Sequence, residues 1–460
     1  MKAMARKKVK GKPNQRSFRI KQGLDTDTVK TISAIKSEPR WMREFRLRAL
    51  RIFERKPLPT WGADLSPLKL DKICYYVRPT DRSARRWEDL PSEIRETYTK
   101  LGIPKAEQQY LAGVSAQYES EVVYGSLREE LAKQGVIFLS MDEALQKYPE
   151  IIKEYFGTVV APDDNKFAAL NSAVWSGGSF IYIPPKVKVS LPLHAFFAIE
   201  SARFGQFERT LIIADKDSFV HYVEGCTAPI YSENSLHAAV VEVIVKEGAR
   251  VRYSTAQNWS RNVYNLTTKR AFVEEEGVIE WVSGSLGSRV TMLYPSSCLR
   301  GKGARADHLL LSLAGEGQVL DTGAKVFHLA PQTSSRVLAK SISRGGGKNV
   351  FRGLLQVAEK AKEAKGNMRC NALLLDETSQ AETFPSLKIK GKDVAVGHEA
   401  TVGKVGEEQL FYLRSRGLDE EEATGLIVNG FIEPIIKEFP LEFAVEINQL
   451  IQLKMKGATG

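Results

Sequence analysis

The chain has 460 residues, 43% of them hydrophobic and 26% charged, which is enough for two or three domains with sizeable cores. The formal net charge of +11 is unevenly placed, because residues 1–60 hold 18 of the 66 basic and 5 of the 55 acidic residues. This pattern favours a solvated basic tail over a dedicated nucleic-acid surface, and no apolar run approaches the roughly 20 residues of a membrane span.

The first 160 residues predict two units, a basic segment over 1–60 and a mixed α/β region over 61–160. Residues 1–15 are expected to be disordered. Over 39–56, apolar side chains recur at helical spacing, and arginines, Arg46 among them, cover much of the remaining surface. We expect this amphipathic helix to dock on its own protein rather than on a membrane. Further helices are predicted over 92–102, 128–134 and 142–155, with strands over 73–77 and 136–140.

From 161 to 405 the helical periodicity is largely missing and short β-runs recur. They are separated by turns with Gly, Asn, Asp or Ser, such as Gly315-Glu316-Gly317 and Gly345-Gly346-Gly347. Such strands fit a sandwich or a solenoid, and the segment is very long for one sandwich. A β-helix can grow one turn at a time, although no strict repeat period is visible. The β-runs lie at 179–183, 211–214, 239–246, 251–255, 278–282, 308–313, 337–341, 354–357, 372–375, 387–389 and 394–396.

A helical domain is predicted over 406–460. Asp419 can cap a helix, with Glu422 three residues later completing a capping box. Pro440 opens a last helix at its first turn. The stretches 423–431 and 439–451 are apolar enough to form either a self-packed bundle, which is the default, or a partner groove.

The four cysteines, Cys74, Cys226, Cys298 and Cys370, are far apart. Without a C-x-x-C pair, neither a zinc module nor a ferredoxin-type cluster is encoded locally. The basic first residues lack the apolar core of a signal peptide, so we expect a cytoplasmic protein with free thiols.

One candidate ligand set combines Cys370 with the adjacent pair His398 and Glu399. Thiolate and imidazole together suit iron, copper or zinc. A buried thiol and a surface imidazole are the ordinary alternative for residues so far apart.

Many short motifs, in order and spacing, resemble SufB of the SufB/SufD family, the scaffold of the Suf iron–sulfur cluster assembly system. The resemblance spans roughly residues 16 to 456. The motifs are EGCTAP (224–229), QNW (257–259), YNLTTKR (264–270), YPSSCLRG (294–301), DTGAKVFH (321–328), FRGL (351–354), EEQLFYLRSRGL (407–418), IVNGF (427–431) and PLEFAVE (440–446).

The resemblance implies a mainly β protein, a right-handed parallel β-helix flanked by the N-terminal α/β region and the C-terminal helices. It implies a non-enzymatic scaffold that holds a transient iron–sulfur cluster, with Cys370, His398 and Glu399 as ligands. It also implies an ATPase partner, SufC, on the C-terminal helices, and recipient apo-proteins and a sulfur donor upstream. The expected docking residues are Ala423, Ile427, Phe431, Phe443 and Ile447.

Two positions depart from the SufB pattern. SufB chains are expected to have a cysteine just after T-K-R, where sulfur would enter, but this chain has Val273 there. Cys226 or Cys298 could take over that role unless both are packing residues. A His expected before T-F-P is Glu382, either an extra oxygen ligand or a solvated acid.

Some motifs also resemble SufD, the paralogue that pairs with SufB. A chain of both characters could pair with itself through the β-helix ends, with His398 of each copy at one interface. We therefore predict a homodimer, or pairing with a SufD-like paralogue.

Two other functions remain open. A carbohydrate-active β-helix enzyme would use acids beside basic residues, such as Asp321 with Lys325 or Glu280 with Arg270. A nucleic-acid binder would use residues 1–56 but lacks a recognisable motif. The glycines of 345–347 lack the remainder of a Walker A motif, so the chain itself should not hydrolyse ATP.

Overall fold

The computed structural model describes residues 18–79, 83–84, 86–100, 107, 109–199, 204–228 and 234–455. The basic tail predicted over 1–15 lies outside this part of the chain, as do residues 456–460 after the last helix.

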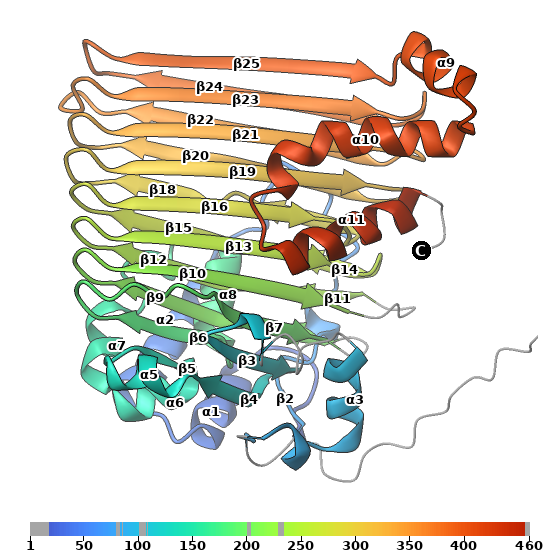
Figure 1. The fold of residues 1–460 in the computed structure, drawn as a ribbon. Coiled ribbons are helices and arrows are strands. Elements are labelled where there is room, and N and C mark those ends of the chain that lie inside the picture. Colours follow the sequence, from blue (N-terminus) through green and yellow to red (C-terminus); the bar gives the residue numbers. More distant parts are fainter. Residues whose placement is uncertain are drawn as a thin grey trace, which may run out of the picture.

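Two sheets, stacked turn upon turn, form a parallel β-helix of about seven turns (Figure 1). This confirms the mainly β fold with flanking N-terminal α/β and C-terminal helical regions. The ten-stranded sheet contains β3 (Gly113–Tyr118), β4 (Glu121–Leu127), β7 (Leu193–Ala198), β10 (Phe219–Thr227), β13 (Arg250–Asn258), β16 (Val278–Ser285), β19 (Arg305–Ala314), β21 (Ser334–Ser343), β23 (Lys365–Leu374) and β25 (Ala395–Lys404). The thirteen-stranded sheet contains β5 (Ile137–Ser140), β6 (Ser179–Ile183), β8 (Gly205–Gln206), β9 (Arg209–Ala214), β11 (Ser235–His237), β12 (Val240–Val245), β14 (Val263–Asn265), β15 (Thr268–Val273), β17 (Val290–Leu293), β18 (Ser296–Leu299), β20 (Val319–His328), β22 (Lys348–Val357) and β24 (Gln380–Ile389).

Successive turns of the β-helix are offset by about thirty residues. Arg305 of β19 pairs with Ser334 of β21, and Ser334 pairs with Lys365 of β23, which are offsets of 29 and 31 residues. Nearer the N-terminus, Arg250 pairs with Val278, an offset of 28 residues. The turns between strands differ in length, so the repeat exists in the strand register without a fixed period in the sequence.

The predicted glycine turns lie where one sheet passes into the other. Residues 315–318 connect β19 to β20, and residues 344–347 connect β21 to β22. Gly317 has a φ of +69° and Gly346 a φ of +78°. Side chains rarely adopt this left-handed conformation, so glycine is favoured at both positions.

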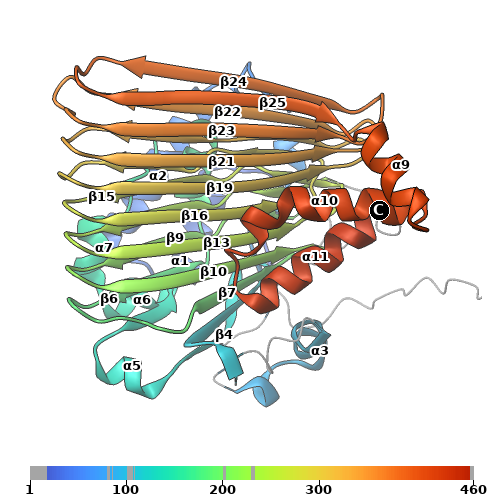
Figure 2. The same cartoon turned by 45° about the horizontal axis from the view of Figure 1, so that its top comes forward.

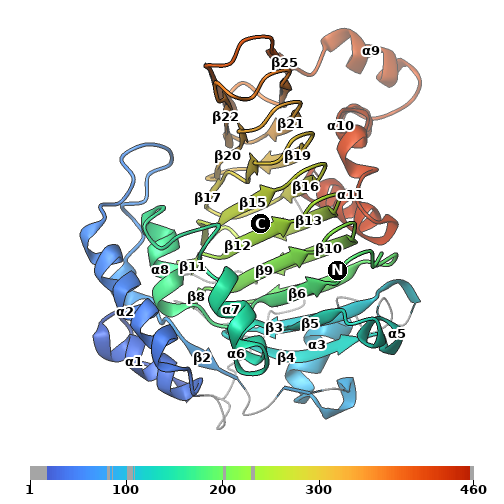
Figure 3. The same ribbon diagram turned by 90° about the vertical axis from the view of Figure 1, so that its left-hand side faces the viewer.

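The N-terminal region closes one end of the β-helix (Figure 3). There β4 pairs antiparallel with β3, and β5 pairs antiparallel with β6. The strand predicted over 73–77 is only a short pairing of β2 (Val77–Arg78) with β1 (Phe18–Arg19). Helices of this region are α1 (Thr26–Ile35), α2 (Arg40–Arg55), α3 (Ser92–Lys100), α5 (Glu129–Lys133), α6 (Met141–Lys147), α7 (Pro149–Tyr155) and α8 (Lys166–Val174), with 3-10 turns η1 (Leu70–Lys72) and η2 (Trp87–Asp89).

Two predictions in this region were wrong in detail. The single helix predicted over 142–155 is two helices, because Pro149 can begin α7 but cannot continue α6. Arg46, predicted on the polar surface of the amphipathic helix, is completely buried. Its guanidinium binds Glu38 at 2.5 Å and the carbonyl oxygens of Ala173 and Trp175. The helix docks on its own protein as expected, packing against α8.

The C-terminal helices return along the outer face of the ten-stranded sheet, opposite the side where α2 and α8 lie (Figure 3). They are α9 (Glu407–Ser415), α10 (Glu420–Ile436) and α11 (Leu441–Met455). The capping box predicted at Asp419 and Glu422 is present. Val428 and Ile432 of α10 and Phe443 of α11 pack with sheet residues such as Val282 and Leu309 in one apolar cluster.

The other end of the β-helix is open. β25 pairs only with β23, and β24 only with β22, so each is an edge strand (Figure 2). No residue of β24 or β25 is buried. Four large apolar side chains are exposed there: Phe384, Leu387, Ile389 and Val402. Edges of this kind offer unpaired backbone groups to another chain.

Candidate functional site at the open end of the β-helix

Cys370 and His398 meet on the last two strands of the ten-stranded sheet. Met368 and Cys370 of β23 face the interior between the sheets, because alternate residues of a strand share a face. In the parallel register Met368 pairs with His398 of β25, which places the imidazole on that same interior side. The Cys370 Sγ lies 3.3 Å from His398 Nε2 and 3.7 Å from the Glu399 carbonyl oxygen. The structure therefore brings this thiol and this imidazole together, and their role as ligands stays a prediction.

The thiol is sheltered by its position just below the last turn. Cys370 is only 5% exposed, and this burial raises the pKa of its thiol, while a hydrogen bond with the Thr383 side chain opposes the rise. His398, on the edge strand, is half-buried. A soft metal that bound here would have to displace the thiol proton, so its binding would release a proton.

Glu399 lies on the opposite face of β25 from His398. Its carboxylate forms an ion pair with Arg369 at 2.9 Å, on the exposed outer surface of the sheet. Alternation along a strand makes this unavoidable for two adjacent residues. Within one chain the predicted trio is therefore a Cys–His pair, with the Glu399 carboxylate directed outwards.

Glu382 is also directed away from Cys370. Its carboxylate forms an ion pair with Lys348 on β22, in the outer surface of the thirteen-stranded sheet. The next residue, Thr383, is the one whose side chain reaches the thiol. Sequence reasoning missed Thr383 and Arg369, although the period of two in β23, β24 and β25 could have identified both.

The two cysteines considered for a sulfur relay lie in different environments. Cys226 of β10 faces the interior, where its Sγ lies 3.7 Å from Glu224 Oε1, and burial raises the pKa of its thiol. Five strand spacings along the ten-stranded sheet separate it from Cys370, about 24 Å at 4.8 Å each. Cys298 of β18 is half-buried and alternates with Ser297, whose hydroxyl meets the buried ring of His308. Val273 is fully buried.

The interior near Cys226 is polar. Glu224 binds Lys269 Nζ at 2.9 Å, with both side chains almost fully buried, and it also accepts from Tyr253 and Thr255. Further along, Asn265 Nδ2 donates to Gln257. Such groups are stable inside a β-helix only because each has a partner.

Three of the five predicted docking residues on the C-terminal helices cannot form an open surface. Phe443 and Ile447 are buried in the apolar cluster shared with the ten-stranded sheet, and Ala423 is completely buried. Ile427 and Phe431 are half-buried. The amphipathic pattern of these helices marked the face that packs on their own protein. The exposed apolar side chains lie on other positions: Phe411, Tyr412, Leu426, Leu441 and Val445.

Neither acid–base pair considered for a carbohydrate-active enzyme forms. Asp321 is buried and binds Tyr294 and Arg352, and it makes no ion pair with Lys325. Glu280 binds Arg250 and Arg252, whereas Arg270 binds Asp164.

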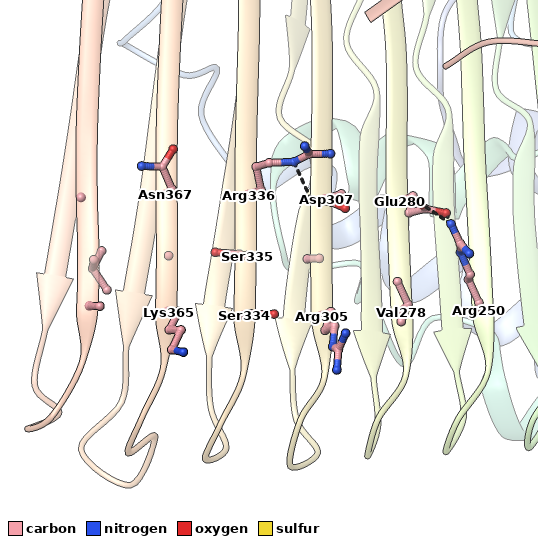
Figure 4. Close-up of a pocket in the computed structure, with 15 residues that line it drawn as sticks. Arg250, Val278, Glu280, Arg305, Asp307, Ser334, Ser335, Arg336, Lys365 and Asn367 are labelled. Carbon is pink, nitrogen blue, oxygen red and sulfur yellow. Dashed lines mark hydrogen bonds and ion pairs between the residues drawn. The ribbon is translucent and has the colours of Figure 1, made fainter. Parts of the chain in front are cut away.

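A shallow groove runs across the ten-stranded sheet at Glu280 (Figure 4). Arg250, Glu280, Asp307 and Arg336 project into it from β13, β16, β19 and β21, and the last two form an ion pair at 3.1 Å. The acids of this groove are thus satisfied by arginines of neighbouring strands.

Among the described residues, no group of three or more His, Cys, Asp and Glu side chains is placed to hold a metal ion. None of their helices is both long and apolar enough to cross a bilayer.

Known proteins match most of the chain. Residues 197–431 match the SUF system FeS cluster assembly SufBD core domain, and residues 89–194 match the SufBD protein N-terminal region. An iron-sulfur cluster assembly SufBD family protein of Staphylococcus aureus strain USA300 is 56% identical over 96% of this chain and 95% of its own length. One from Staphylococcus haemolyticus is also 56% identical, with the same coverage. The chain belongs to the SufBD family of iron–sulfur cluster assembly proteins.

Proposed function

We propose that this chain is a scaffold, not an enzyme, on which an iron–sulfur cluster is assembled and from which it is transferred. The observation that carries the proposal is the 3.3 Å approach of Cys370 Sγ to His398 Nε2 at the open end of the β-helix. Thiolate and imidazole are both iron ligands, and mixed ligation supports a cluster that is bound less firmly than by four thiolates.

A Cys–His pair is too few ligands for a cluster, so the remainder must come from outside this site. Because β24 and β25 are exposed edge strands with four exposed apolar side chains, a second chain is the natural supplier. A two-fold contact would bring a second Cys370 and His398 to the same interface. Glu399 could join only if its ion pair with Arg369 opened. We favour a homodimer of SufB character; a SufD-like paralogue would use the same edge.

The route of sulfur is part of the proposal. Cys226 shares the interior face of the ten-stranded sheet with Cys370, and polar groups such as Glu224 and Lys269 lie beside it. It is therefore the better relay candidate. Cys298 follows Ser297, which faces the interior, so its thiol lies on the opposite face of β18. The Glu382 carboxylate also faces outwards. Both orientations argue against a role in sulfur transfer or cluster binding.

One experiment tests the ligand site and the dimer together. The full chain is reconstituted anaerobically with iron and sulfide, then analysed by size-exclusion chromatography with light scattering and an absorption detector. We expect visible absorption to elute with a species of twice the 51.3 kDa of one chain. Colour on a monomer would refute the shared site, and absence of colour would refute the scaffold.

The partner ATPase is expected to dock on the exposed side chains of the C-terminal helices. Replacing Phe411 and Tyr412 together by serine should weaken binding of a SufC-like ATPase at least tenfold, since exposed aromatic anchors each contribute about 2 kcal/mol or more to interfaces. Binding is measured by calorimetry.

The matched control for this prediction is Tyr110→Ser in the N-terminal region. Tyr110 is 46% exposed, compared with 77% for Phe411, so it also loses an accessible aromatic ring. It should bind the ATPase as the unaltered chain does. Equal binding by all three proteins would place the ATPase elsewhere.

A further inference from the structure

A second cleft lies on the thirteen-stranded sheet, away from the Cys370 site. It has a volume of about 480 Å³, within the range of small-molecule sites. One wall is the segment 56–61 that follows α2, a second is the start of α8, and the floor comes from β17, β20 and the residues before β15. Neither the scaffold function nor the cluster site uses any of these residues.

Lys325 projects into this cleft without an acidic partner. Its Nζ lies 5.3 Å from the centre of the Tyr294 ring, and among the described residues it makes no hydrogen bond or ion pair. It is half-buried, and burial lowers the pKa of its ammonium group. Charged groups withdrawn from water are normally paired, so an unpaired ammonium in a cleft indicates that the partner is a ligand.

An aromatic wall stands beside this ammonium. Trp61 is 49% exposed, yet its position is fixed by the Tyr294 ring at 5.7 Å and the Arg352 guanidinium at 5.4 Å. Gly62 follows it with a φ of +86°, a backbone conformation that side chains rarely adopt. An exposed but immobilised ring is a platform on which a planar group can stack.

The remaining lining favours an anion. The cleft contains Lys56, Lys166 and Lys325 against the single acid Asp164, whose carboxylate already binds Arg270 at 2.6 Å. The N-terminus of α8, capped by Asn165, adds the positive end of a helix dipole.

Lys166 has a structural role in this lining. Its Nζ binds the carbonyl oxygens of Phe53 and Lys56, and so holds the first wall in place. Lys56 and Lys325 are then the cations that remain available, and Lys325 is the one that lies beside the Tyr294 ring.

We propose that the cleft binds a phosphate monoester that carries an aromatic ring, with the phosphate at Lys325 and the ring on Trp61. A dianionic phosphate matches the excess of two positive charges in the lining better than a monocarboxylate does. The ammonium on the floor and the indole on the first wall both contact Tyr294, so a single molecule can reach both.

Adenosine monophosphate is the probe for this proposal, titrated into the full chain by calorimetry. We expect saturable binding, with adenosine and inorganic phosphate each at least tenfold weaker. Lys325→Met and Trp61→Ala should each weaken the nucleotide at least tenfold. Melting curves of both variants establish that they are folded.

The matched control is Lys340→Met. Lys340 is also half-buried over an aromatic ring, with its Nζ 4.4 Å from the centre of Phe431, but it lies on the other sheet. This variant should bind the nucleotide normally. Lack of nucleotide binding, or unchanged binding by Lys325→Met, would overturn the proposal. If inorganic phosphate bound as tightly as the nucleotide, the role of Trp61 would be overturned. If adenosine bound as tightly as the nucleotide, the role of Lys325 would be overturned.

Discussion

Replacing Cys370 by serine is expected to abolish the cluster that the unaltered chain acquires on anaerobic reconstitution. The substitution leaves the size of the side chain nearly unchanged, yet it exchanges the sulfur beside His398 for an oxygen that rarely ionises and suits iron less well. Bound iron and acid-labile sulfide should fall at least about tenfold, because replacing even a residue that only holds a metal ligand in place costs roughly that much affinity. Absorption spectra and chemical analysis measure both.

Cys298→Ser is the control for this result, since it makes the same exchange at a half-buried thiol elsewhere in the same β-helix. It should retain the cluster. His398→Gln should lower cluster content less than Cys370→Ser, because sulfide or a second chain can replace a nitrogen ligand more readily than the thiolate. If Cys370→Ser kept its full iron content, the cluster would have to bind elsewhere.

The largest loss of stability is expected from Arg209→Met. Arg209 and Glu242 form a completely buried ion pair, with Arg209 Nη2 2.6 Å from Glu242 Oε2. Glu242 also accepts hydrogen bonds from the backbone of Gly157, Val159 and Val160, so the pair fastens the segment before α8 to the sheet. Removing the guanidinium leaves a buried carboxylate without a counter-charge, at a cost of about 3–5 kcal/mol.

Urea unfolding followed by tryptophan fluorescence would measure this loss. Arg250→Met is the matched control, because Arg250 also makes two contacts with one carboxylate, that of Glu280, but is half exposed to solvent. A solvent-exposed pair contributes about 0–1 kcal/mol. Similar unfolding midpoints for the two variants would mean that the buried pair contributes no more than the exposed one.

The sequence predicted the architecture well because its β-runs and turns are local features. All eleven runs predicted between 179 and 396 overlap an observed strand, and eight of them lie wholly within one. The pairing of those strands was not visible, because each turn of the β-helix differs in length by a few residues. Cys370 and His398 are 28 residues apart, close to one turn, and only the register of β23 with β25 makes them neighbours.

The faces of the strands were harder to predict than their positions. His398 and Glu399 were taken as one ligand pair, but adjacent residues of a strand must point to opposite sides. Buried charge was equally hidden: nothing in the local pattern distinguishes Arg46, which binds Glu38 in the interior, from the solvated arginines of the same helix. On the C-terminal helices, the apolar periodicity identified the face that packs on the protein itself. The exposed apolar side chains, which could contact a partner, became visible only in the structure.

The Cys370–His398 site lies at the end of the β-helix, where the last strand can fray. A terminal strand is held by a single ladder of backbone hydrogen bonds, so β25 can fray while β23 and the turns below it stay intact. His398 therefore lies on an edge strand that can fray, whereas Cys370 lies on a strand that is paired on both sides. α9 begins three residues after β25 ends, so a force applied to that helix would act on β25 before it acted on the strands below.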